Sequence, residues 1–243
     1  MKIALASIHS SDHDLSGNLE KMTAAVHEAA AAGADLVLFG ESTLTGFDSI
    51  NFNYAHDIKI ALALRSPEIS SFRKLARELE IAIGFGFIEN EKGAIYSSYL
   101  VIDTEGEIAD NYHRVSQGWR TPDACADYRE GESFHSFPLL GKRFTTLICG
   151  DFWEDELLTA IVGADAESDC FLWPVHVNLP LERGSIDRRE YRERTEILAR
   201  PVLFVNNQGV LDGVAYGGAF VWQQGRELAA HEPETPGILY YEL

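Results

Sequence analysis

The sequence TTLICGDFWEDE, residues 145–156, ends an apolar run in a cysteine that is followed by a cluster of acidic side chains. Residues 145–148 have the character of a buried β-strand, and four of the last six residues are Asp or Glu. Neighbouring carboxylates raise the pKa of a thiol and weaken it as a nucleophile. Cys149 is therefore either an inert packing residue or a nucleophile whose base and positive charge come from elsewhere in the chain.

Two other predicted strand ends carry chemically useful groups. GADLVLFGESTLTGF, residues 33–47, places Glu41 just past an apolar run, and YSSYLVIDTEGEIADNYHRV, residues 96–115, ends near Arg114. Open α/β sheets place ligand sites at strand ends, so Glu41, Arg114 and Cys149 are candidates for one shared cavity. Taken singly, each has a simpler interpretation: a surface carboxylate, a structural cation and a small buried apolar residue.

Helix-like and strand-like patterns alternate along the chain. Since no linker or repeat interrupts them, we expect one domain over residues 1–243, built as a mixed sheet with helices on one face or as two such layers packed sheet to sheet. A terminal β pair is expected from Gly218–Val221 and Ile238–Glu242. The other expected strands are Ile3–Ala6, Asp35–Phe39, Ile81–Ile88, Ala94–Asp103, Ile108–Val115, a run ending at Cys149, Cys170–Pro174 and Val202–Asn206, and the expected helices are Asn18–Ala32, Pro67–Glu80, Glu154–Gly163 and Tyr191–Ala199.

Composition excludes several classes of protein. A net charge of −18 over 243 residues argues against a nucleic-acid partner, because phosphate binding needs clustered Lys and Arg. No apolar stretch is long enough to span a membrane, and the N-terminal apolar run is too short for a signal peptide. Three scattered cysteines (Cys125, Cys149 and Cys170) form neither a disulfide framework nor a zinc site, and no other metal-ligand pattern occurs. A cytoplasmic location is expected.

Five segments, in order, resemble the carbon–nitrogen hydrolase (nitrilase) superfamily. Residues 33–47 are similar to its GADLVVFPE-x-x-LTGY segment, residues 96–115 to its hairpin ending in Y-x-K, and residues 145–156 to G-x-x-ICYD-x-x-FPE. Residues 193–209 and 217–229 resemble two later segments. The resemblance implies an α/β fold, a four-layer αββα sandwich of two mixed sheets packed face to face with helices outside. It also implies a homodimer or a higher homo-oligomer.

The resemblance assigns chemistry to the three strand ends. Cys149 would be the nucleophile that attacks the carbon of a small linear carboxamide and forms a thioester, and Glu41 would be the general base. Asp151 would be structural, and Glu156 falls on the glutamate of the FPE element. A positioned carboxylate can remove the thiol proton during attack, so no free thiolate is needed. No cofactor is implied.

The sequence departs from the family pattern at two positions. Arg114 stands where the family has its catalytic lysine, and arginine is longer, planar and forked. Ala124 stands where a supporting glutamate is expected, so Asp123 or Asp127 would have to replace it after a loop shift.

Three residues are predicted on the substrate side: His176, Trp153 and Asp123. His176 follows a strand that borders the pocket in the family, so it either contacts the substrate or packs. Trp153, four residues after Cys149, favours a carboxamide over a nitrile.

Two other hypotheses remain open at this stage. The substitutions at Arg114 and Ala124 would suit a catalytically impaired homologue that serves as a binding or regulatory subunit. A protein outside the family, with an incidental cysteine, would lack two back-to-back sheets.

Overall fold

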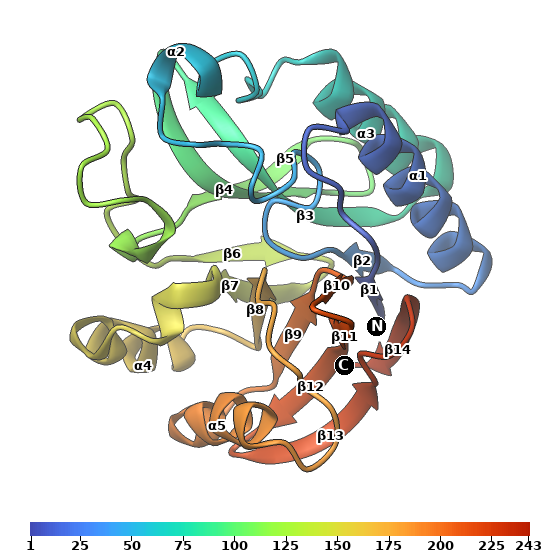
Figure 1. The fold of residues 1–243 in the computed structure, drawn as a ribbon. Helices are drawn as coiled ribbons and strands as arrows, with labels where there is room; N and C mark the ends of the chain where they lie inside the picture. Colours follow the sequence, from blue (N-terminus) through green and yellow to red (C-terminus); the bar gives the residue numbers. More distant parts are fainter.

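A computed structural model describes residues 1–243, and two six-stranded mixed sheets pack face to face at its centre (Figure 1). The first sheet has the order β14-β1-β2-β3-β4-β5 and the second β13-β12-β9-β8-β7-β6. The first is built from β1 (Lys2–Ser7), β2 (Leu36–Leu38), β3 (Ala82–Glu91), β4 (Ala94–Ile102), β5 (Ile108–His113) and β14 (Gly237–Glu242). The second is built from β6 (Ser136–Leu139), β7 (Lys142–Thr146), β8 (Cys170–Val175), β9 (Val202–Asn206), β12 (Ala219–Gln223) and β13 (Arg226–His231).

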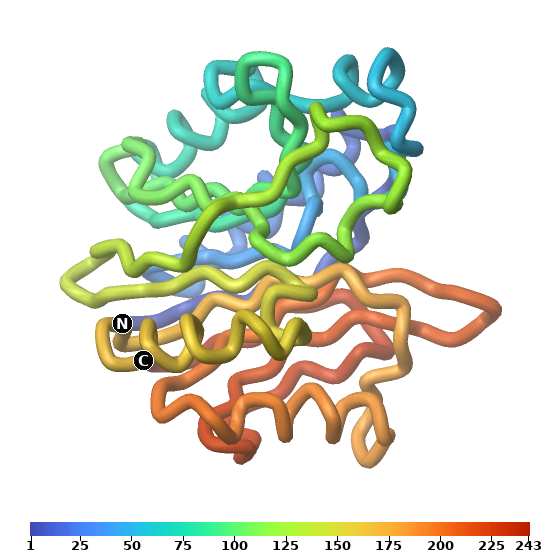
Figure 2. The backbone as a smooth tube through the Cα atoms, turned by 90° about the vertical axis from the view of Figure 1, so that its left-hand side faces the viewer, coloured from blue at the N-terminus to red at the C-terminus, as the bar shows by residue number.

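Both sheets have parallel strands at the centre and antiparallel strands outside. In the first, β1, β2 and β3 are parallel neighbours; in the second, β7, β8 and β9 are. A separate hairpin, β10 (Gly209–Leu211) with β11 (Val214–Tyr216), follows β9. The backbone trace shows the sheets stacked between outer helices, with the two termini side by side (Figure 2).

Helices cover the outer face of each sheet. On the first lie α1 (Leu15–Ala31) and α3 (Pro67–Leu79), and on the second lie α4 (Leu158–Asp165) and α5 (Ile186–Arg194). The short α2 (Tyr54–Asp57) and four 3₁₀ turns, Gln117–Trp119, Cys149–Phe152, Asp155–Leu157 and Thr195–Ile197, complete the chain. The αββα sandwich predicted from the sequence is confirmed.

Alternation along the strands explains the four layers. In β1, Ile3 and Leu5 point into the core between the sheets, whereas Ala4 and Ala6 point toward α1 and α3. Successive side chains of a strand point to opposite faces, so a strand that is buried on both faces has apolar residues throughout.

Several boundaries differ from the sequence-based expectations. The helix predicted at Glu154–Gly163 is α4, which begins four residues later at Leu158, after a 3₁₀ turn. The helix predicted at 191–199 is α5, five residues earlier, because the Ser185 hydroxyl accepts from the Arg188 N–H and starts it there. The helix predicted to start at Asn18 begins at Leu15, where Asp14 caps it. The strand predicted to end at Cys149 ends at Thr146.

The expected terminal β pair is wrong. β12 pairs with β9 and β13, while β14 pairs with β1 in the other sheet. The unpredicted strand β13 occupies the edge of β12, which leaves β14 to close the first sheet beside β1. No helix in the structure has both the length and the apolar character that crossing a membrane would need.

Candidate active site

The structure brings together the three side chains predicted from the strand ends. Arg114 Nη1 donates to Glu41 Oε1 at 3.0 Å, and both side chains are buried. The Cys149 thiol contacts the Glu41 carboxylate and lies in the field of the Arg114 guanidinium. A sulfur, a carboxylate and a fixed positive charge therefore meet at one point, although 73 residues separate Glu41 from Arg114.

Glu41 lies in the turn after β2, and every polar atom of the residue except Oε2 has a hydrogen-bond partner. Its N–H donates to the Val175 carbonyl at 3.2 Å, and its carbonyl accepts from Asn207 Nδ2 at 2.6 Å, which ties the turn to the second sheet. Oε1 also accepts from the Ser97 hydroxyl at 3.1 Å. Oε2 is buried without any hydrogen-bond partner, so one carboxylate oxygen of Glu41 remains free to accept a proton.

Gly86, on the neighbouring strand β3, allows the Glu41 turn to pack closely against that strand. A Cβ on Gly86 of β3 would lie 2.3 Å from the Ser42 nitrogen and 2.7 Å from the Glu41 Cα. Such contacts are too short for any side chain, so a residue larger than glycine would push the turn outward.

Cys149 opens a 3₁₀ turn and has an unusual backbone conformation. Its φ is 42°, in the left-handed region that non-glycine residues seldom adopt. The Trp173 indole N–H donates to the Cys149 carbonyl at 3.0 Å and holds the turn from the β8 side. A strained residue that its surroundings hold in place is frequent at functional sites.

Asp151 joins the Cys149 turn to the end of β5. Its fully buried carboxylate accepts from the Val115 and Ser116 N–H groups, the Ile148 N–H and the Tyr112 hydroxyl, all at 2.7–3.0 Å. Because Val115 directly follows Arg114, this carboxylate fixes the distance between the sulfur and the guanidinium.

Arg114 is held at two of its three nitrogens. Nε donates to the Ser116 hydroxyl at 2.7 Å and Nη1 donates to Glu41, while Nη2 donates to no protein group and lies beside Gly150. Burial tends to lower the pKa of Arg114, but the charges of Glu41, Cys149 and Asp151 raise it above its ordinary value. The guanidinium therefore stays charged.

The Cys149 thiol is protonated at neutral pH. Burial raises its pKa to about 12, and the Glu41 charge acts in the same direction. The Arg114 charge and the His176 backbone N–H act the other way without cancelling the rise. The thiol can act as a nucleophile when a base takes its proton, and the neighbouring Glu41 carboxylate, with its unpaired Oε2, is the candidate base.

His176 follows β8 and presents its backbone N–H to the sulfur. Its ring stacks on Phe47, with centroids 4.9 Å apart, and Nδ1 lies 3.2 Å from Asn207 Nδ2. Burial lowers the pKa of His176 despite the nearby charges of Glu41, Asp48 and Asp12. The ring is therefore neutral near pH 7, and the backbone of this residue supplies a second donor at the site.

Comparison with known families fits this geometry. The profile of the carbon–nitrogen hydrolase family matches residues 2–243. The chain belongs to the carbon–nitrogen hydrolase family. The sequence resemblance is thereby confirmed, and the hypothesis of an unrelated protein with an incidental cysteine is wrong.

Known relatives of this chain include amidases. An (R)-stereoselective amidase from Pseudomonas sp is 28% identical over 90% of this chain and 75% of its own length. The glutamine-dependent NAD(+) synthetase of Acinetobacter baylyi is 25% identical over 99% of this chain, which spans 43% of that enzyme. The fold matches that of a cysteine-to-alanine variant of an amidase from Nesterenkonia AN1, with a TM-score of 0.81, 22% identity, and coverage of 100% of this chain and 90% of that one.

Other predicted residues lie outside this cluster. Trp153 is exposed, edge-on to Tyr191, with the Arg194 guanidinium 5.4 Å above its ring, and Glu156 is exposed as well. Asp123 is exposed on the loop after the Gln117–Trp119 turn, and the exposed Asp127 contacts the Cys125 sulfur at 3.7 Å.

Neither aspartate hydrogen-bonds to the central residues, so the expectation that one of them replaces the supporting glutamate is not met. Ala124 packs beside a small apolar cluster instead. Ser116 holds Arg114, and sequence reasoning missed it although it lies two residues after the arginine. Ser97 and Asn207 were also missed, and the signal available for Asn207 was its position directly after β9.

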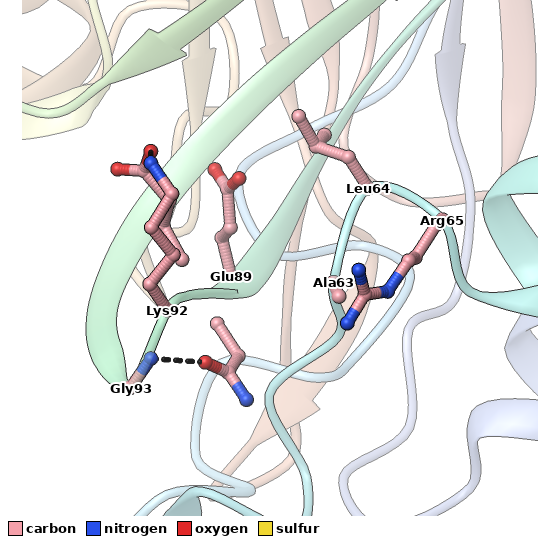
Figure 3. Close-up of a pocket in the computed structure, with 8 residues that line it drawn as sticks. Ala63, Leu64, Arg65, Glu89, Lys92 and Gly93 are labelled. Atoms are coloured by element: carbon pink, nitrogen blue, oxygen red, sulfur yellow. Dashed lines mark hydrogen bonds and ion pairs between the residues drawn. The ribbon is translucent and has the colours of Figure 1, made fainter.

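A wider pocket of ≈ 450 Å³ lies at the turn between β3 and β4, away from Cys149 (Figure 3). Its one buried acid, Glu89, is already bound by His113 at 2.9 Å and by Asn111. It contains no Cys, Ser or Thr side chain, and the structure contains no group of three or more His, Cys, Asp or Glu side chains placed to hold a metal ion.

Proposed function

We propose that this hydrolase cleaves the carbon–nitrogen bond of a small linear carboxamide through a thioester on Cys149. The observation that carries the proposal is the buried Oε2 of Glu41, which has no hydrogen-bond partner and belongs to the carboxylate that contacts the thiol. Since Ser97 and Arg114 already occupy Oε1, Oε2 is the acceptor for the thiol proton.

The reaction then runs in two halves. The sulfur bonds to the amide carbon as Glu41 takes its proton, and the carbonyl oxygen becomes an oxyanion. Glu41 returns the proton to the departing nitrogen, the carbon–nitrogen bond breaks, and ammonia leaves a thioester on Cys149. Water attacks that thioester while Glu41 takes one of its protons, and the thiol leaves reprotonated.

Fixed donors stabilise the oxyanion in both halves. Arg114 Nη2 has no protein partner, and the His176 N–H points at the sulfur. Donors that are already in place when charge develops are the main source of stabilisation in such reactions. Because an arginine cannot give up a proton at working pH, Glu41 carries all proton transfer.

The space beside the site fits a small acyl group. A cavity of ≈ 70 Å³ is lined by Phe47, Asp48, Ile50, Phe52, Ile88 and Trp119. Phe47 stacks on His176, and the turn that contains Trp119 packs against the Cys149 turn. A volume equivalent to about two waters and five apolar walls favour a short aliphatic acyl chain.

The alternative of a catalytically impaired binding or regulatory subunit loses one of its two reasons. It rested on Arg114 and Ala124. The Arg114 side chain turns inward and pairs with Glu41, which removes the first reason, while Ala124 packs beside an apolar cluster and no aspartate takes the place of the supporting glutamate. A cytoplasmic location and a homodimer or higher homo-oligomer remain predictions from the sequence.

Ammonia release from a panel of short carboxamides tests the proposal. The wild-type protein should release ammonia, Cys149→Ala should lose at least about 1000-fold in kcat/KM, and Cys125→Ala, which removes an exposed thiol outside the site, should match the wild type. Turnover that survives Cys149→Ala, or its absence in the wild type on every amide, would rule out the proposal.

A further inference from the structure

Gly150 leaves a space that the Arg114 guanidinium fills. A Cβ on residue 150 would lie 2.2 Å from Arg114 Nη2, 3.2 Å from its Cζ and 3.1 Å from the Ser116 hydroxyl oxygen. Cβ contacts below 3.0 Å essentially do not occur, so any other residue at 150 would force the guanidinium to move.

The backbone does not require glycine at this position. Gly150 is absent from the residues with positive φ, whereas its neighbour Cys149 has a φ of 42°. Alanine could adopt the same backbone conformation, and the space beside Arg114 is what it would lack. Glycine is therefore required at position 150 by the space that Arg114 occupies and not by the backbone conformation of the turn.

Ser116 and Glu41 orient the guanidinium from the other sides. Nε donates to Ser116 at 2.7 Å and Nη1 donates to Glu41 at 3.0 Å. A guanidinium is planar, so two bonds at different nitrogens fix its plane as well as its position. The third nitrogen, Nη2, is left facing Gly150 and the Cys149 turn. Ser116 is itself fully buried, and its N–H donates to Asp151.

We propose that Gly150 and Ser116 are positioning residues that form, with Glu41, a guanidinium pocket specific for Arg114, so that Nη2 serves as the oxyanion donor. The proposal deepens the proposed function and rests on it for the role of Nη2. Lysine has one terminal nitrogen on a shorter, flexible chain. A lysine cannot donate to both Ser116 and Glu41 and also fill the space at Gly150, so the site is specific for arginine.

A double-mutant cycle on Arg114→Lys and Gly150→Ala tests the proposal. A displacement of about 1 Å costs roughly 100-fold in rate, so each single variant should lose about that much in kcat/KM for a short carboxamide. The double variant should lose no more than Arg114→Lys alone, because the added methyl then has no guanidinium to displace. Gly163→Ala is the control, since a Cβ there meets nothing within 4 Å.

A second readout does not depend on hydrolysis. The guanidinium charge favours the Cys149 thiolate, so Gly150→Ala should slow alkylation of Cys149 by iodoacetamide at fixed pH in the Arg114 protein. In the Arg114→Lys protein the same change should have no effect. Ser116→Ala adds no atoms and should also slow alkylation when residue 114 is arginine, but not when it is lysine. This variant replaces Gly150→Ala in the test if thermal unfolding shows that Gly150→Ala does not fold.

The outcomes separate the two proposals. Coupled losses in alkylation with no amide hydrolysis by the wild type would support the guanidinium pocket and contradict the proposed function. Additive losses in both readouts, or a Gly150→Ala variant with wild-type rates, would overturn the guanidinium pocket while leaving a hydrolysing wild type in place.

Discussion

At the residue scale, Cys149 combines a high pKa with a neighbour able to take its proton. Burial and the Glu41 charge raise the pKa of the thiol to about 12, so it stays protonated across the neutral range. The acidic residues that follow Cys149 in the sequence are not the main cause, because Asp151 is engaged by four donors and Glu156 is exposed. The proton must therefore leave during attack.

The raised pKa predicts how Cys149 titrates. Because a raised thiol pKa means less thiolate at any given pH, the ultraviolet absorbance of thiolate, measured as wild type minus Cys149→Ser, should show no step below about pH 9. Any signal from the exposed Cys125 is common to both proteins and should cancel in the difference. A step near neutral pH would mean that Cys149 forms an ion pair with Arg114 at rest, contrary to this account.

At the scale of elements, strand ends were predictable and the turns after them were not. A buried apolar run located β2, and the turn at residues 104–107 located β5 as the second strand of a hairpin, which placed Glu41 and Arg114 at strand ends. The turn at Cys149 depends on long-range contacts from Trp173 and Asp151, which no local pattern reports. The loop of residues 116–135 has no apolar period, so Ser116 could be recognised as a partner of Arg114 only from side-chain geometry.

The close approach of Gly86 to the Glu41 turn predicts that the position of this turn depends on the neighbouring strand β3. Gly86→Ala would place a Cβ 2.3 Å from the Ser42 nitrogen, and overpacking of this kind costs about 1–3 kcal/mol in the free energy of unfolding. The displaced turn should also lower kcat/KM, measured beside chemical denaturation. Gly163→Ala, inside α4, should leave kcat/KM unchanged and should not lower stability, because alanine favours a helix over glycine by about 0.5–1 kcal/mol. A Gly86→Ala variant with wild-type stability and rate would contradict the role given to Gly86.

At the scale of the whole molecule, the site exists because the two sheets pack face to face. Glu41 and Arg114 come from the first sheet and Cys149 from the second, and Asp151 and Asn207 hydrogen-bond across the join. Family resemblance predicted this sandwich correctly. The pairing of the last strand was wrong because the choice between β1 and β12 as its partner depends on which edges other strands leave open.

The central claim is that Cys149 carries the acyl group during turnover. Rapid quenching of the wild-type protein with a short carboxamide, followed by intact-mass analysis and peptide mapping, tests it most directly. The account predicts an added mass equal to the acyl group on the peptide that contains Cys149, lost again as substrate is consumed and absent from Cys149→Ala. Ammonia release with Cys149 unmodified throughout turnover, or with the acyl group on Cys125, would contradict it.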